Sequence, residues 1–384
     1  MAGTFPGGVE LEVRVYHLDE SGKLTRRGIT RMATGHYQTC QYTAGPFELI
    51  VPVAALYSDA LKIDELVLID RTYWGVITGR VEEHGTSNQV TVSGSTLLDW
   101  LSRRVIVPDS AVHEDKPMGY DSVSGSTETV MKHYVERHAS NPDNPARRIP
   151  ALICATDQER GLSEDAYLAR YVNLLDTVES IGRRAHLGCH IDGDEYTGTF
   201  RFEVRPRRDR TAHQSDNPPL LLEIARNNVA SQTYTQDYKQ SGNVFYCSRA
   251  GDQYEWETLT QTYFLDGSSE PAGQSRREQA LSISVDADGN QYQELEKNAR
   301  KEMESYRAVE TITCTMSRNL QYGVDYQVGD YATVIDRRTG MTADMELEAV
   351  DTVVTETTID YVATFGQPQL TRLEKLQRDT KARL

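Results

Sequence analysis

The sequence lacks the features that mark several large classes of protein. No run of 18 apolar residues occurs in its 384 residues, so no membrane-spanning helix is expected. The opening stretch MAGTFPGGVELEV has no positively charged segment followed by an apolar run, so no signal peptide is expected. The five cysteines are Cys40, Cys154, Cys189, Cys247 and Cys314. An odd, dispersed set without CxxC spacing favours free thiols in a reducing cytoplasm over a disulfide framework.

Positive charge is scarce as well. The chain has 41 Lys and Arg against 57 Asp and Glu, which gives a formal net charge of −16. Affinity for nucleic-acid backbones comes mainly from Lys and Arg, so this balance argues against specific nucleic-acid binding. The short basic pairs, Arg103–Arg104 and Arg147–Arg148 among them, are diluted by nearby acids and are interpreted as solvated loops and strand ends.

Recognisable catalytic motifs are missing too. The patterns GxSxG, HExxH, GxGxxG and GxxxxGK[ST] do not occur, which removes the common nucleophile, zinc and phosphate-binding signatures. Cys40 or Cys154 as a thiol nucleophile has no identifiable histidine partner. With 57 acidic residues, choosing two carboxylates for a glycosidase would be arbitrary. The sequence therefore predicts no catalytic residue and no cofactor, and the protein is not expected to be an enzyme.

Metal sites fail on spacing. His186, Cys189 and His190 lie close together, but a strand would point them to opposite faces and no second cluster completes a zinc site. His133 and His138 are five residues apart, which is poor for a shared metal, so they are interpreted as surface or satisfied interface histidines. The DADGN segment at 286–290 has glycine at its fourth position instead of the sixth, which breaks a calcium loop. No metal is predicted.

What the sequence does contain is mostly β-structure. Tyrosine is common, with 21 residues against 7 Phe and 3 Trp, and suits surfaces that are half in contact and half wet. Apolar residues alternate with polar ones at 9–15 and 47–53, which is the period of a half-buried strand. Several further short strands with turns between them follow up to residue 100. Residues 1–104 are therefore expected to form a small β-barrel or sandwich, of which we take the β-barrel module as the prediction.

A helix is expected at 126–138, after a long polar loop. Ser126 or Thr127 can cap it, and Glu128 falls in its positive first turn. Its apolar stripe is formed by Val130, Met131, Tyr134 and Val135. We interpret the loop and helix as a junction, and expect Trp100, Tyr134 and Val135 to be buried where the first module meets an insert.

That insert is expected to be an α+β segment over residues 105–225. A second helix is predicted at 164–181, capped by Ser163 and ended by Gly182. A hairpin follows, with strands near 184–191 and 200–204 and a turn at Asp192–Gly193–Asp194.

A second β-barrel module is expected at 226–368, interrupted by a helix at 290–307, and a polar helix at 369–384 follows. Two stretches echo each other: LVLIDR at 66–71 with VTVSG at 90–94, and TVIDRR at 333–338 with YVATFG at 361–366. Each pair brackets a hairpin and precedes a leucine-spaced stretch. Chance similarity between β-rich hairpins is the simpler explanation; two related modules is the other. The expected fold is α+β, mostly β, with two related small barrels around the insert.

Two strings of the junction carry a resemblance to a known family. DWLSRRVIVP at 99–108 and GYDSVSGSTETVMKHYVERH at 119–138 resemble the siphovirus Gp37-like family, tail proteins of long, non-contractile-tailed phages and prophages of actinobacteria. DYQVGDYATVID at 325–336 is similar to strands of tail-hub proteins more generally. The family carries no agreed catalytic motif, so no active-site residue is transferred.

The resemblance implies a structural tail-hub protein of the virion, at the distal end of the tail and synthesised in the bacterial host cytoplasm. Hubs of this kind form a homotrimer ring in which two similar modules per subunit present six near-equivalent positions to a sixfold tube. The implied partners are the distal tail protein ring, the tape measure protein C-terminus and tail-tip or receptor-binding proteins, with DNA passing through the channel. The alternatives are a cell-wall-degrading tail enzyme, an endopeptidase or glycosidase, and the hub of a contractile injection system.

Overall fold

The fold divides into two compact units. The computed structural model describes residues 11–366 except 33, 56, 86–87, 109–118, 250–258, 266–268, 286–289, 339 and 356. Among these, Thr233–Ile312 forms one unit and the residues before and after it form the other. The predicted C-terminal helix at 369–384 and most of the DADGN segment lie outside the described residues. Across the described part of the chain, no helix has the length and apolar character needed to cross a lipid bilayer.

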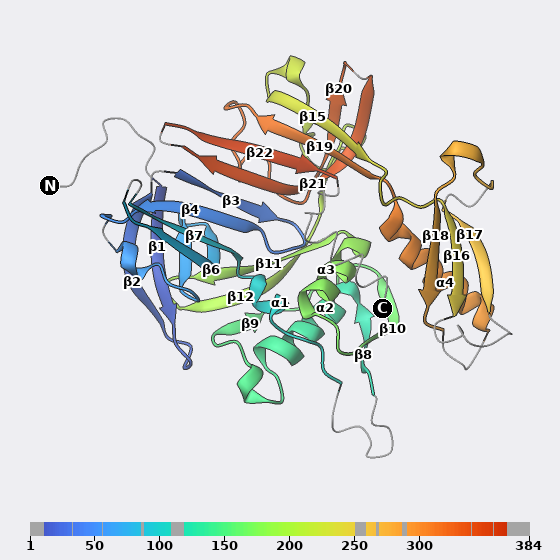
Figure 1. The fold of residues 1–384 in the computed structure, drawn as a ribbon, viewed down its shortest axis with the longest axis horizontal. Helices are drawn as coiled ribbons and strands as arrows, with labels where there is room; N and C mark the ends of the chain where they lie inside the picture. The colour runs from blue at the N-terminus through green and yellow to red at the C-terminus, as the bar shows by residue number, and fades with distance from the viewer. Residues whose placement is uncertain are drawn as a thin grey trace. The chain divides into compact units, whose positions relative to one another are not determined.

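The first unit is built on one large, curled sheet (Figure 1). Part of its strand order is β22-β21-β3-β4-β7-β6-β5-β1-β2. Their bounds are β1 (Leu11–Leu18), β2 (Leu24–Met32), β3 (Thr34–Cys40), β4 (Pro46–Pro52), β5 (Leu66–Ile69), β6 (Tyr73–Glu83), β7 (Gln89–Thr96), β21 (Met341–Val354) and β22 (Ile359–Phe365). β20 (Asp330–Asp336) pairs with β21, and β13 (Arg208–Arg210) and β14 (Leu221–Leu222) pair with β20. Beyond β22 come β19 (Val309–Met316) and β15 (Val229–Asp237), through which the chain leaves for the second unit and returns.

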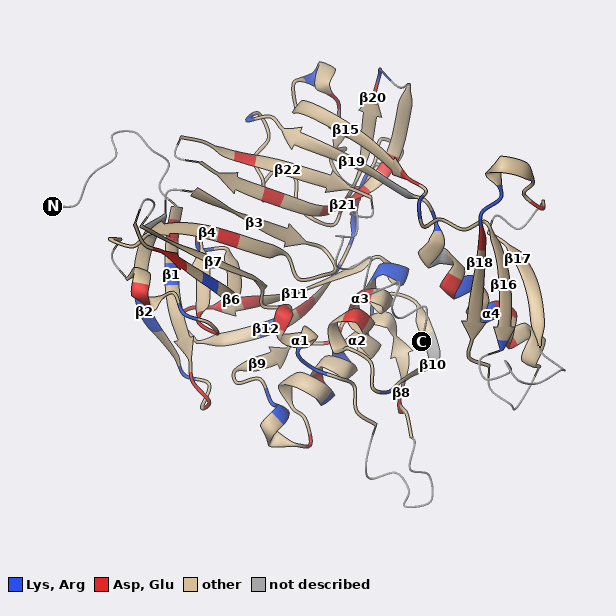
Figure 2. Ribbon diagram, viewed as in Figure 1, with Lys and Arg blue, Asp and Glu red and all other residues tan. Residues whose placement is uncertain are grey.

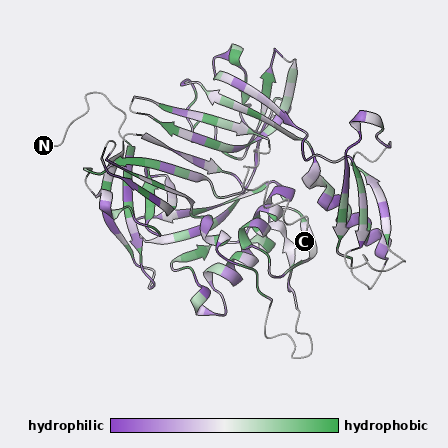
Figure 3. Ribbon diagram, viewed as in Figure 1, coloured by the Kyte–Doolittle hydropathy of each residue, from purple (hydrophilic) through white to green (hydrophobic). Residues whose placement is uncertain are grey.

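Part of this sheet is buried on both faces, which explains the continuous apolar run at 66–69. Val67 and Ile69 of β5 face a core enclosed by the curl of β1–β7. Leu66 and Leu68 of the same strand point the other way, into a second core shared with the insert. A strand with two buried faces needs apolar side chains at every position, not at alternate ones. Elsewhere in the sheet, hydrophobic and hydrophilic positions alternate along the strands (Figure 3).

The structure confirms a mostly β fold in several sheets, but the described strands of the first module do not close into a barrel. β1 is hydrogen-bonded to β2 and β5, and among the described residues no ladder joins β2 to β3 or β4. The sheet instead continues from β3 into β21, with Tyr37 opposite Thr352. Strands 330–365 therefore extend the first sheet, whereas 233–312 folds separately, a grouping that differs from the predicted boundary at 226–368.

The insert contributes helices and two small sheets to the first unit. α1 (Asp99–Ser102) ends the first module. The insert then contains β8 (Asp121–Ser126), α2 (Thr127–Val135), η2 (Glu136–Ser140), β9 (Leu152–Cys154), β10 (Ser163–Ala169), α3 (Leu174–Ala185), β11 (Leu187–Asp194) and β12 (Thr199–Pro206). β10 pairs with β8, and β12 pairs with both β11 and β9. Single turns of 3-10 helix occur at Ser58–Ala60, Pro145–Arg147 and Ile224–Arg226.

The predicted helix at 126–138 is confirmed, and the one at 164–181 is placed wrongly. Ser126 Oγ accepts a hydrogen bond from the backbone N–H of Thr129, which makes Ser126 the N-cap of α2. Ser163, the predicted second cap, instead begins strand β10. The cap of α3 is Asn173, whose side chain accepts from the N–H groups of Leu175 and Asp176. Acidic residues after a serine are an N-cap signal only if the chain turns there, and pairing with β8 keeps this stretch extended.

The junction core is buried as predicted. Tyr134 and Val135 are fully buried and Trp100 is 8% exposed. All three belong to one cluster with the outward-facing side chains of β1, β5 and β6 and with the apolar faces of α3, β11 and β12. The ring of Phe200 lies between two indoles, with centroids 5.4 Å from Trp74 and 5.2 Å from Trp100, both edge-on. The first module and the insert therefore share a single core.

The second unit has a core of its own. β16 (Val244–Arg249) lies between β17 (Thr260–Phe264), which is antiparallel to it, and β18 (Glu278–Ile283), which is parallel. A 3-10 turn at Gly273–Ser275 precedes β18, helix α4 (Gln291–Met303) follows it, and a second 3-10 turn at Glu304–Tyr306 continues α4. The helix buries Leu295, Ala299 and Met303 against the sheet, whereas Tyr292 is exposed. The predicted helix at 290–307 is confirmed.

Candidate functional site

A group of hydrogen-bonded charged side chains in the first unit lies around α2, at the contact with the strands beside it. We name as the junction network the side chains of Asp121, Glu128, Lys132, His133, His138 and Arg160. Figure 2 shows acidic and basic positions interspersed along the helices and sheets of this unit. The network ties α2 and its π-helical extension η2 to β8 and to the loop before β10.

Asp121 is the centre of one half of the network. It is 2% exposed, and its two carboxylate oxygens accept hydrogen bonds from Nε2 of His133 at 2.9 Å and Nε2 of His138 at 2.7 Å. Burial acts to raise the pKa of Asp121, but the two histidine hydrogen bonds and the nearby charge of Arg137 hold it well below its usual range. Asp121 is therefore ionised, and both of its carboxylate oxygens accept hydrogen bonds.

Glu128 is the centre of the other half. It is completely buried, and Nζ of Lys132 lies 2.5 Å from its Oε1 while Nε of Arg160 lies 2.6 Å from its Oε2. Burial opposes ionisation, yet the hydrogen bonds from Arg160 and Lys132 lower the pKa of Glu128 to about 2. A buried charge paired on both oxygens fixes the position of α2 and leaves no free base.

A second pair of buried carboxylates lies on β21, facing α3. Tyr42 donates to Oε1 of Glu346 at 2.5 Å, and Nη1 of Arg183 donates to Oε2 of Glu348 at 2.6 Å. The Arg183 guanidinium also lies 4.5 Å from the centroid of the Tyr42 ring. Burial raises the pKa of Glu348 to about 7, against the opposing effect of Arg183. A raised pKa is one mark of a catalytic acid, but here the carboxylate oxygen is held by a structural arginine.

The cysteine thiols are poorly suited to act as nucleophiles. All five cysteines are free. Burial raises the pKa of Cys40, Cys154 and Cys314 to about 12. It raises the pKa of Cys247 to about 11. A thiol with such a pKa is protonated at neutral pH and is a poor nucleophile.

The HLGCH segment is spread out by its local structure. His186 caps α3 in a left-handed conformation and bonds to Glu346 at 3.2 Å. Cys189 is buried on β11, and His190 lies on the opposite face, 3.2 Å from Asp192. In the described part of the chain, no three His, Cys, Asp or Glu side chains are placed to hold a metal.

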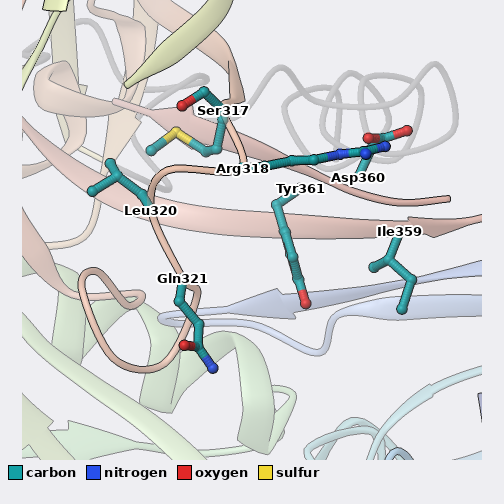
Figure 4. Close-up of a pocket in the computed structure, with 8 residues that line it drawn as sticks. Ser317, Arg318, Leu320, Gln321, Ile359, Asp360 and Tyr361 are labelled. Carbon is teal, nitrogen blue, oxygen red and sulfur yellow. The ribbon is translucent and has the colours of Figure 1, made fainter. Parts of the chain in front are cut away.

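A shallow pocket of about 280 Å³ opens beside β22 (Figure 4). Its lining residues are Met316, Ser317, Arg318, Leu320, Gln321, Ile359, Asp360 and Tyr361. They include one cation, one carboxylate and one phenol, but no thiol or imidazole. This set can contact a ligand or a protein surface. Its one serine, Ser317, donates its hydroxyl to the carbonyl of Asn227 at 2.6 Å and not to a base.

The sequence predicted His133 and His138 to be surface or satisfied interface histidines, and it did not reveal their partner Asp121. In the structure Nε2 of each bonds to Asp121, whereas Nδ1 of the buried His138 has no hydrogen-bond partner among the described residues. Asp121 lies 12 residues before His133 and 17 before His138, in a polar stretch that reads as loop. Arg160 and Glu348 come from still more distant segments. No local pattern marks these residues, because the pairs exist only once β8, α2, α3 and β21 have come together.

Comparison with known proteins identifies the group to which this fold belongs. No curated protein matches the sequence. Residues 12–367 match the family described as Siphovirus ReqiPepy6 Gp37-like protein. The chain belongs to this family. The resemblance seen in the junction strings is therefore confirmed over nearly the whole chain.

Solved structures share the fold of this Gp37-like protein at low sequence identity. The tail protein from Neisseria meningitidis MC58 is 16% identical with a TM-score of 0.54, over 94% of this chain and 97% of that one. The 43 kDa tail protein of prophage MuSo2 from Shewanella oneidensis is 13% identical with a TM-score of 0.55, over 93% and 98%. A chain of the Francisella PdpA–VgrG complex has 8% identity and a TM-score of 0.50, over 94% of this chain and 54% of that one. The Gp37-like chain thus has the fold of phage tail proteins.

Proposed function

We propose that this Gp37-like chain is a structural tail-hub protein of a long, non-contractile-tailed phage. Three copies form a ring that closes the distal end of the tail tube and connects it to the tail tip. The ring meets the distal tail protein ring on one side and tail-tip or receptor-binding proteins on the other. The tape measure protein C-terminus and then DNA pass through its channel.

The observation that carries this proposal is a repeated three-stranded meander. β5, β6 and β7 pair in order, all antiparallel, and so do β20, β21 and β22. Each middle strand is the long one, with 11 residues in β6 and 14 in β21, and each carries a register shift, at Ile77/Gly79 and at Leu347/Ala349. These are the two stretches whose sequences echo each other.

The two meanders lie in one sheet, joined through β4 and β3. Two similar modules in each of three subunits would give six near-equivalent positions, which is what a sixfold tube requires of a threefold ring. Paired modules serve no obvious purpose in a single-site enzyme. The repeat therefore supports the hub over a substrate-transforming role.

The buried carboxylates and thiols fit a structural role and not a catalytic one. Asp121, Glu128 and Glu348 each bond to a cationic or imidazole side chain, and the described cysteines have raised pKa values. The net charge of −16 per copy would also keep exiting DNA from adhering to the channel, since like charges repel within about 8 Å at physiological salt. A cell-wall-degrading enzyme has less support. The hub of a contractile injection system is the other alternative, and the likeness to the Francisella PdpA–VgrG chain extends to the fold only.

An image of the virion tests the proposal directly. We expect three copies of the chain around a central channel at the distal end of the tail tube, with acidic side chains lining the channel. A chain that surrounds no pore, or a channel lined mainly by Lys and Arg, would contradict the hub. A contractile sheath around the same tube would favour the injection-system alternative. Wall hydrolysis abolished by a single carboxylate or cysteine substitution would favour the enzyme.

A further inference from the structure

An exposed apolar surface lies on the insert, where two short stretches run side by side. Its residues, here called the ribbon face, are Val105, Val107, Tyr120, Leu168, Tyr171 and Val172, each between 38% and 66% exposed. The backbone N–H of Ile106 donates to the carbonyl of Val172 at 2.9 Å, and the backbone N–H of Tyr171 donates to the carbonyl of Ile106 at 2.7 Å. Strands β8 and β10 continue the same ribbon, with Leu168 opposite Ser122.

The outward positions at 105–107 and 168–172 are mostly apolar where solvent would favour polar side chains, whereas the outward positions of β8 are Ser122 and Ser124. Ile106 is fully buried, so its neighbours Val105 and Val107 point the other way, to the surface. In β10, Ala169 is buried and Tyr167 packs on the junction core, whereas Leu168 between them is half exposed. A strand with one wet face normally alternates apolar and polar residues. Contiguous apolar side chains on the wet face are typical of a surface that another protein covers.

Tyr171 holds its ring outward from an unusual backbone conformation. Its φ is 50°, in the left-handed region that residues with a bulky side chain seldom adopt. The side chain is 66% exposed, so packing within this unit does not explain the strain. Strained residues are concentrated where a site needs a particular geometry. Tyrosine is also one of the residues that most often anchors a protein interface.

A basic rim borders the ribbon face. Nε of Arg104 donates to the carbonyl of Arg147 at 3.0 Å, and Nη2 of Arg147 donates to the carbonyl of Val105. Arg148 is exposed beside them. Burial and the charges of Arg147 and Arg103 lower the pKa of Arg104. Among the described residues Arg103 forms ion pairs with Asp64 and Asp99, but Arg104, Arg147 and Arg148 form none, although the whole chain carries a net charge of −16.

We infer that the ribbon face is the surface by which one copy of this chain docks on the next, and this inference rests on the proposed ring. An apolar centre with an uncompensated arginine rim fits a partner of net negative charge, and a second copy of this acidic chain is such a partner. In a threefold ring each subunit presents one face to its neighbour and a different face to the other, so the contact is head-to-tail. The acidic surface that receives the ribbon face therefore lies elsewhere on the same chain.

The oligomeric state of the full-length chain in solution tests this inference. Light scattering after size-exclusion chromatography should give the wild-type chain a mass three times its 43.2 kDa. Tyr171→Gly removes the ring while glycine adopts the left-handed backbone without strain, so the fold should remain intact and the unfolding temperature unchanged. We expect this variant to need at least a tenfold higher concentration to assemble. Arg148→Glu should have the same effect, and it should weaken assembly less as the salt concentration rises.

Matched controls separate the ribbon face from the rest of the surface. Tyr196→Ser changes a tyrosine that is 92% exposed on the β11–β12 turn, and Arg338→Glu reverses an exposed charge after β20. Both variants should assemble like the wild-type chain. Val107→Ser provides a second apolar variant if Tyr171→Gly proves to lower the unfolding temperature.

The outcomes distinguish this inference from the hub proposal. A wild-type trimer that Tyr171→Gly, Val107→Ser and Arg148→Glu all leave unchanged would overturn the ribbon face and leave the ring standing. The inference would also be overturned if the wild-type chain stayed monomeric at roughly 100 times the concentration at which stable complexes usually assemble. The inference would also be overturned if the ribbon-face variants remained trimeric but lost binding to a purified distal tail or tail-tip protein. The ribbon face would then bind that protein and not a second copy of this chain. The virion image decides the ring independently.

Discussion

Arg183 of α3 and Glu348 of β21 form an ion pair in which Nη1 lies 2.6 Å from Oε2. The pair joins the insert to the strand that extends the large sheet, and the carboxylate is only 9% exposed. Glu346, two residues earlier on the same face, bonds to Tyr42 and His186. The insert therefore contacts both meanders. It packs on β5 and β6 through the junction core, and it bonds to β21 through Arg183 and His186.

This arrangement predicts a specific pH dependence of stability. Burial raises the pKa of Glu348 from 4.5 to about 7, so the folded chain binds a proton that the unfolded chain releases. The stabilisation is fully present below pH 4.5 and is lost as the pH rises towards 7, with a magnitude of at most about 3 kcal/mol. Urea unfolding between pH 4.5 and 7.5 should show this slope in the wild-type chain, and Glu348→Gln should reduce it. Equal slopes in the two proteins would contradict the assignment.

Glu128 predicts the opposite dependence. Its pKa is lowered to about 2, so its stabilisation is present above pH 4.5 and is lost as the pH falls through 2. Glu128→Gln leaves Lys132 buried beside a neutral amide and should cost about 3–5 kcal/mol at pH 7. The difference from the wild-type chain should shrink between pH 4.5 and 2.

Chemical denaturation of Glu128→Gln at several pH values measures this difference. Glu136→Gln is the matched control, since Glu136 is exposed and comes directly after the last residue of α2. It should change the free energy of unfolding by less than about 0.5 kcal/mol. A pH-independent cost of Glu128→Gln would mean that the lost packing, and not the charge, is responsible.

The cap of α3 offers a test of where this helix begins. The side chain of Asn173 accepts hydrogen bonds from the N–H of Leu175 at 2.9 Å and of Asp176 at 3.2 Å. It also donates to the carbonyl of Ser102 at 2.6 Å. Asn173→Ala should therefore cost about 1–2 kcal/mol in thermal or urea unfolding. Ser163→Ala, at the position that the sequence suggested as a cap, should cost less than about 0.5 kcal/mol. A larger loss of stability in Ser163→Ala than in Asn173→Ala would instead support the helix predicted at 164–181.

These cases show which parts of the fold were predictable. Helix α2 was, because Ser126, the apolar stripe and the acidic first turn all lie within a dozen residues. Strands in the first module were visible from alternation, although the sheet does not close into the expected barrel, and the burial of β5 on both faces was not predicted. Helix α3 was misplaced because Ser163 and the acids after it carry a local cap signal that pairing between β10 and β8 overrides.

The rest depended on contacts between distant segments. The continuation of the first sheet into β21 joins Tyr37 to Thr352, and no local pattern records such a pairing. For the same reason the separate unit at 233–312 was read as part of a second barrel. Among the site residues, His133 and His138 were predicted to be surface or satisfied interface histidines, but the Asp121 carboxylate that accepts a hydrogen bond from Nε2 of each was not predicted.

Trp100 tests whether the first module and the insert are one cooperative structure. Its indole packs edge-on against Phe200, whose ring also meets Trp74 of β6. Trp100→Ala would leave a cavity at the meeting point of α1, β6 and β12, and should lower the free energy of unfolding by about 3–5 kcal/mol. Tyr196→Ala is the control, because this side chain is 92% exposed and its loss should be nearly neutral.

Urea unfolding followed by both circular dichroism and tryptophan fluorescence distinguishes two possibilities. If the shared core couples the module and the insert, both signals should shift together to lower urea in Trp100→Ala. A loss below about 1 kcal/mol, or a shift seen by one signal alone, would mean that the two parts unfold independently. In that event the insert could not hold the two meanders in a fixed relation, and the hub would need its subunit neighbours to fix the geometry that we assign to the chain itself.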